Sequence, residues 1–171
     1  RWDSTVAAVF PELAGTMDAG LRRVTLRQLL SHTSGIPSDN QAFTDLIGKS
    51  FAQESLNLDG LRYWLVRQWS TQPLAAEPGA RFAYANMGYA LAGAMLERIA
   101  RSTWEEMVVA RIFTPFGFRT AGFGPQSSLG RVDAPLGHLI RPDGTLMPML
   151  AGPDGDNPVI LGPAGTVHLS I

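Results

Sequence analysis

The stretch Glu77-Pro-Gly-Ala-Arg-Phe-Ala-Tyr-Ala-Asn-Met-Gly-Tyr-Ala-Leu-Ala-Gly93 decides how this chain folds around Tyr84. Its Pro-Gly pair predicts a turn, and the residues that lead to Tyr84 are expected to run extended out of that turn. A helix rich in small residues is predicted over residues 87–100, with Asn86 at its N-cap. The sequence therefore places Tyr84 where an extended segment meets a helix.

The composition is that of an ordinary globular protein, and we expect residues 1–171 to form a single domain. The 171 residues are 45% hydrophobic and 17% charged, enough to bury roughly two thirds of the unfolded surface. A net charge of −1 gives no field that would attract nucleic acid. No apolar run approaches the roughly 20 residues that span a bilayer, and the absence of cysteine leaves the compartment unknown.

The pattern of apolar residues predicts a mainly α fold with a few short strands. Helices are expected at residues 25–31, capped by Thr25, at 59–69 and at 103–113. Residues 38–56 are polar and are expected to be irregular. Beyond Pro115 the chain is rich in Gly, Pro and Asp and predicts loops with short strands.

Three segments in one order give the chain a resemblance to a known family. They are Val24-Thr-Leu-Arg-Gln-Leu-Leu-Ser-His-Thr-Ser-Gly-Ile-Pro37, Tyr84-Ala-Asn86 and Arg111-Ile-Phe-Thr-Pro-Phe-Gly117. Together they resemble the penicillin-recognising serine hydrolases, which comprise class C β-lactamases, D,D-peptidases and related esterases. The resemblance covers Trp2 to Ile171 and implies the central helical subdomain of that α/β fold.

Two catalytic elements of the resembled family are absent from the chain. The family acylates a serine that is followed three residues later by a lysine, one helical turn away. The only lysine is Lys49, and position 46 is Leu46, so neither Ser-x-x-Lys nor a later Lys-Thr-Gly occurs. The Gly-x-Ser-x-Gly motif of the unrelated α/β-hydrolases is missing as well.

The resemblance implies four candidate site residues. Tyr84 corresponds to the family's catalytic tyrosine, and Asn86 to the amide beside it. Asp39, in the Ser38-Asp-Asn40 loop, and Gly165, in Gly162-Pro-Ala-Gly-Thr-Val-His-Leu-Ser170, are candidate substrate-binding residues, although Thr166 replaces the family's usual second glycine. A phenol titrates near pH 10 and becomes a base near neutrality only when cations stabilise its anion. Alone, Tyr84 is expected to be an ordinary phenol.

Other chemistries find little support in the sequence. His32 has hydroxyl neighbours in Ser31 and Thr33, but sequence neighbours rarely form a triad, and the resemblance implies a structural role for His32. The three histidines lie far apart, and Asp154-Gly-Asp-Asn157 lacks the glutamate of a calcium loop. We therefore expect no metal and no cofactor.

The sequence predicts part of a serine hydrolase that supplies the Tyr-x-Asn side of a cleft and is inactive alone. Its substrate in the intact protein would be a small amide or ester, and a β-lactam, a peptide and an ester cannot be told apart. An uncovered apolar face is expected to cause self-association. Two alternatives stay open: a non-catalytic binding module that lost the nucleophile, and an unrelated helical protein with chance matches.

Overall fold

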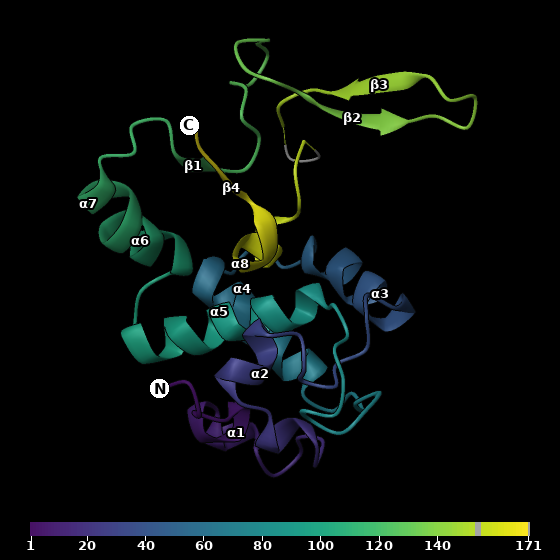
Figure 1. Ribbon diagram of the computed structural model, residues 1–171, viewed down its shortest axis with the longest axis vertical. Helices are drawn as coiled ribbons and strands as arrows, with labels where there is room; N and C mark the ends of the chain where they lie inside the picture. Colours follow the sequence, from purple (N-terminus) through teal and green to yellow (C-terminus); the bar gives the residue numbers. More distant parts are fainter. Residues whose placement is uncertain (153–154, 171) are drawn as a thin grey trace. The chain divides into compact units, whose positions relative to one another are not determined.

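The computed structural model describes residues 1–152 and 155–170, so Asp154 of the rejected calcium loop lies outside the described residues. The chain divides into two compact units, Arg1–Trp104 and Glu105–Ile171. The expectation that residues 1–171 form a single domain stays a prediction. The mainly helical content with a few short strands is confirmed (Figure 1).

The first unit is helical. Its elements are α1 (Val6–Val9), the 3₁₀ turns η1 (Pro11–Leu13) and η2 (Leu21–Arg23), α2 (Leu26–Leu30), α3 (Gln41–Ser50), α4 (Leu58–Trp69) and α5 (Asn86–Ala100). Helix α5 packs against α1, α2 and α4, and α3 packs against α4 (Figure 1). The longest helix of the unit therefore lies at its centre and carries the candidate site at its N-terminal end.

Helix α2 begins where the sequence predicts. The Thr25 hydroxyl accepts the Gln28 N–H at 3.3 Å, and the Gln28 side chain accepts the Thr25 N–H at 3.0 Å, which makes a capping box. A Cβ at Gly88 of α5 would lie 3.2 Å from the Leu29 carbonyl oxygen. The predicted close backbone approach of the small-residue helix is thus made against α2.

Helix α3 corrects the expectation that residues 38–56 are irregular. Asn40 starts it, because its Oδ1 accepts the Phe43 N–H at 3.0 Å. Phe43 and Leu46 are buried at helical spacing, while most other side chains of α3 face solvent. Its apolar stripe is so narrow that the polar composition of the segment hid the helical period.

Helices α4 and α5 share a buried ion pair as well as an apolar core. Leu65 and Leu91 are fully excluded from solvent. The Arg62 guanidinium of α4 donates to the Glu97 carboxylate of α5, with side chains 0% and 3% exposed. Ile99, in the last turn of α5, is 61% exposed.

The segment expected as a helix at 103–113 is helical, but it changes from an α-helix to a π-helical turn and back to an α-helix. It consists of α6 (Trp104–Val108), a π-helical turn η3 (Val109–Phe113) and α7 (Thr114–Phe116). Pro115 has no N–H to donate, and Gly117 ends α7 in the left-handed conformation with φ 67°.

The second unit contains short antiparallel pairs, as predicted beyond Pro115. Strand β1 (Gly122–Phe123) pairs with β4 (Val167–His168), and β2 (Gly137–Ile140) pairs with β3 (Leu146–Met149) through a turn at residues 141–145. The 3₁₀ turn η4 (Val159–Leu161) and α8 (Gly162–Gly165) precede β4. Among the described residues, no helix is both long enough and apolar enough to cross a bilayer.

Candidate active site

Tyr84 ends an extended segment that leads directly into α5. Its side chain is 52% exposed, and its hydroxyl donates to Asn86 Oδ1 at 3.0 Å. Ala85, between them, is 1% exposed. Alternate side chains of an extended segment point to opposite sides, so Tyr84 faces solvent while Ala85 faces the interior. The phenol oxygen is therefore accessible to a reacting group.

Asn86 is the first residue of α5 rather than its N-cap, which corrects the expectation from the sequence. The N-cap is Ala85, and it makes no side-chain capping bond. The Asp39 carboxylate caps instead, by accepting the Asn86 backbone N–H at 3.2 Å. A residue 47 positions earlier thus satisfies this helix end, so the side chain of Asn86 is not needed as a cap.

Asp39 also orients the amide of Asn86. Its Oδ2 accepts the Asn86 Nδ2 at 2.6 Å, so the amide oxygen points to the phenol of Tyr84. Asn40, the next residue, caps α3 and thereby anchors the loop that carries Asp39. The structure thus brings together three of the predicted site residues in one hydrogen-bonded chain of carboxylate, amide and phenol.

The loop that follows α2 is hydrogen-bonded to the segment before Tyr84. The Thr33 carbonyl accepts the Gly79 N–H at 2.7 Å, and the Gly35 carbonyl accepts the Ala75 N–H at 2.8 Å. Gly35 has φ 80°, and a Cβ there would lie 2.1 Å from the Ala76 carbonyl oxygen, so only glycine fits. The loop after α2 and the segment before α5 are consequently tied together by backbone bonds.

His32 lies in this loop and forms no Ser–His pair with its neighbour. The Ser31 hydroxyl bonds to that of Thr33 at 2.9 Å, whereas His32 Nδ1 accepts the Ala85 N–H at 3.3 Å. The structural role expected for His32 agrees with these contacts. No local pattern predicts this partner, because Ala85 lies 53 residues away from His32.

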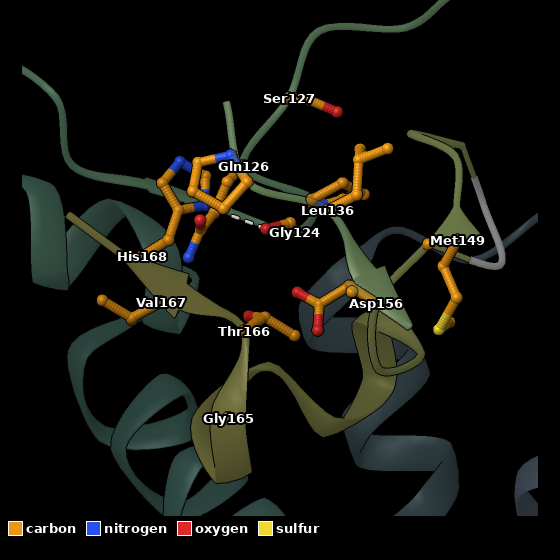
Figure 2. A pocket seen from close by; sticks show the side chains of 14 residues that line it. Gly124, Gln126, Ser127, Leu136, Met149, Asp156, Gly165, Thr166, Val167 and His168 are labelled. Carbon is orange, nitrogen blue, oxygen red and sulfur yellow. Dashed lines mark hydrogen bonds between the residues drawn. The ribbon is translucent and has the colours of Figure 1, made fainter. Parts of the chain in front are cut away.

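Gly165 lies in the second unit, at a cavity of about 340 Å³ (Figure 2). Its φ is 157°, and its carbonyl accepts the Asn157 Nδ2 at 2.9 Å. The cavity is also lined by the side chains of Gln126, Asp156 and Thr166, and Figure 2 shows His168 Nδ1 bonded to the Gly124 carbonyl at 2.9 Å. His168 is thus engaged in a structural contact, and all lining residues belong to the second unit.

The described residues offer no cluster of three or more His, Cys, Asp or Glu side chains suited to a metal ion. The first unit instead presents the phenol of Tyr84, which is hydrogen-bonded to the oriented amide of Asn86.

Tyr84 and Asn86 lie at the start of α5 beside the His-Thr-Ser-Gly loop, in the segments that resemble the penicillin-recognising serine hydrolases. The sequence profile of the beta-lactamase family matches residues 1–170. The chain belongs to the beta-lactamase family, whose members are serine hydrolases.

Known relatives carry different activities in their names. Penicillin-binding protein 4 of Amycolatopsis lactamdurans is 29% identical over 163 residues, which are 91% of this chain and 40% of that protein. Lovastatin esterase of Penicillium rubens is 29% identical over 136 residues, which are 72% of this chain and 33% of the esterase. The octameric penicillin-binding protein homologue from Pyrococcus abyssi, 24% identical, matches with a TM-score of 0.65 over 99% of this chain and 36% of its own. The chain therefore spans well under two thirds of the relatives it matches.

Proposed function

We propose that the chain supplies the tyrosine side of an active site for acyl transfer, acting on a serine that lies outside residues 1–171. The supporting observation is the hydrogen-bonded chain from Asp39 through Asn86 to the half-exposed phenol of Tyr84. Membership of a serine hydrolase family supports the same reaction class. The chain then corresponds to the central, mostly helical part of the family fold.

In this mechanism Tyr84 accepts the proton of the nucleophile and later donates it. As a phenolate, its oxygen accepts the proton of the seryl hydroxyl while the seryl oxygen attacks the substrate carbonyl, and the resulting phenol then donates that proton to the leaving group. Asn86 holds the phenol and can donate to a substrate carbonyl when its amide moves off Asp39. Asp39 and Gly165 are retained as candidate substrate contacts, Gly165 on the wall of its cavity.

A phenolate needs a cation nearby, and the family's lysines have no counterpart beside Tyr84 in the sequence, since the only lysine is Lys49. Lys49 lies in the last turn of α3, whereas Asn40 caps the first turn. The rise of 1.5 Å per residue separates the two ends by roughly 13 Å, so this lysine is far from Asp39 along the helix. We propose that the required cation also comes from outside the chain, and that the 171 residues alone are inactive.

The substrate is proposed to be a small amide or ester. Among the relatives, one is named an esterase and another a putative D-alanyl-D-alanine carboxypeptidase, which would cleave a peptide amide. Self-association is proposed as well, because Trp2, Phe51 and Phe82 are 57–67% exposed and one homologue is described as an octamer.

The test compares the complete gene product with the 171-residue chain on a chromogenic cephalosporin, a p-nitrophenyl ester and a D-alanyl-D-alanine peptide. Tyr84→Phe in the complete product should lower kcat/KM by roughly 10²–10⁴-fold. Tyr63→Phe is the matched control, because Tyr63 lies on α4 outside the cluster. Full activity of Tyr84→Phe, or acylation of a serine within the isolated chain detected by mass spectrometry, would refute the proposal.

The same experiment separates the binding-module alternative. A complete product that binds the cephalosporin or peptide without turnover, and equally well with Tyr84→Phe, would favour a non-catalytic module. Reading the gene upstream of Arg1 gives an independent answer, because the enzyme requires a Ser-x-x-Lys there.

A further inference from the structure

His32 is held in a backbone conformation that histidine rarely adopts. It follows the C-cap Ser31 of α2 and has φ 56°, in the left-handed region. A side chain in this region places its Cβ close to the following carbonyl oxygen, which costs free energy. Something in the surrounding structure must therefore stabilise His32 in this geometry.

The stabilising contacts bracket Tyr84 on both sides. The His32 carbonyl accepts the Ala83 N–H at 2.8 Å, and its ring Nδ1 accepts the Ala85 N–H at 3.3 Å. One residue thus fixes the peptide groups before and after the candidate catalytic tyrosine. An imidazole nitrogen that accepts carries no proton, so the neutral ring must hold its proton on Nε2.

The ring of His32 also packs directly against the phenol. Its centroid lies 4.5 Å from that of Tyr84 with an interplanar angle of 36°, and 5.0 Å from that of Tyr89. Phe82 makes an edge contact at 5.5 Å. Tyr89 is itself fixed, because its hydroxyl donates to the Leu30 carbonyl at 2.9 Å. The His32 ring therefore contacts both the ring of Tyr84 and the ring of Tyr89, in the first turn of α5.

We infer that His32 is a positioning residue for Tyr84: as a neutral Nδ1 acceptor it holds the backbone on both sides of the phenol and packs against its ring. The inference rests on the proposed function of Tyr84. His32 takes no proton from the nucleophile, because its Nδ1 lone pair is occupied by the Ala85 N–H. In a charged ring, Nδ1 would carry a proton and would face the Ala85 N–H donor to donor. This hydrogen bond would break, and the segment around Tyr84 would be released.

The test uses the complete gene product with ¹⁵N-labelled histidine and alanine. NMR should show the His32 proton on Nε2 at mildly alkaline pH and slow hydrogen exchange of the Ala85 amide. His32→Asn keeps an acceptor oxygen and tolerates a positive φ, whereas His32→Phe keeps an aromatic ring without an acceptor. The Ala85 amide should stay protected in His32→Asn and exchange faster in His32→Phe.

Kinetics supply the second readout. His32→Phe should lower kcat by roughly 10- to 100-fold with little change in KM, and His32→Asn should restore most of it. A proton on Nδ1, or an Ala85 amide equally protected in both variants, would overturn the inference. These NMR outcomes do not depend on turnover, so they separate failure of the positioning role from failure of the proposed enzyme.

Discussion

Substitution of Glu97 by glutamine should destabilise the first unit by about 3–5 kcal/mol, because it removes one partner of a buried ion pair. The side chains of Arg62 and Glu97 are 0% and 3% exposed. Glu97 Oε1 also accepts the Trp104 N–H at 2.9 Å, so the carboxylate joins α4, α5 and the start of α6. After the substitution the Arg62 guanidinium stays buried beside a neutral amide. The Glu97 carboxylate then no longer offsets the hydration that the guanidinium lost on folding.

The chain contains a matched exposed pair for comparison. Arg23 and Glu77 are 2.9 Å apart, with side chains 66% and 76% exposed. Glu77→Gln makes the same chemical change at the surface and should cost about 0–1 kcal/mol. Chemical denaturation followed by tryptophan fluorescence and circular dichroism measures both variants. In thermal unfolding, Glu97→Gln should lower Tm by roughly 6–20 °C.

A double variant separates the ion pair from simple loss of packing. Arg62→Met with Glu97→Met removes both charges together and should be far less destabilising than Glu97→Gln alone. If Glu97→Gln costs no more than Glu77→Gln, the reasoning from burial is wrong.

Three further predictions follow from particular contacts. Asn40→Ala should destabilise α3 by about 1 kcal/mol in chemical denaturation, because it removes the N-cap, while Asn40→Asp should not. Burial raises the pKa of Tyr63 above its ordinary 10.0, and the Glu12 carboxylate raises it further. The protonated phenol of Tyr63 therefore stabilises the folded state fully below pH 10.0, and this stabilisation is lost as the pH rises through the folded-state pKa. Tyr63→Phe should lack this alkaline loss in a pH series of unfolding. Size-exclusion chromatography of the 171-residue chain should give species larger than a monomer, and a clean, stable monomer would speak against self-association.

The elements predicted well are those whose signals are local. Helix α2 follows from a capping box within four residues, and α4 from apolar residues at helical spacing. Helix α3 was missed because only a narrow stripe of it is buried. The π-helical turn at Val109–Phe113 was missed because nothing in a helical pattern distinguishes the two hydrogen-bonding schemes.

For the candidate site, the sequence selects residue types but does not predict their geometry. Tyr84, Asn86 and Asp39 were selected by resemblance, and the structure brings them together. Their connections could not be read from the sequence because the Asp39 and His32 contacts span 47 and 53 residues. The expected capping role of Asn86 was wrong for the same reason, since a distant carboxylate performs it.

The long-range contacts explain why a three-residue motif can mark a site at all. Tyr84 and Asn86 share a face only because Ala85 between them is turned inward, with its N–H on the His32 ring. A large side chain at Ala85 would have no room at 1% exposure and would rotate the segment, separating the phenol from the amide. The motif therefore carries information only together with the loop after α2, and a Tyr-x-Asn triplet without that loop has no physical reason to form the same pair.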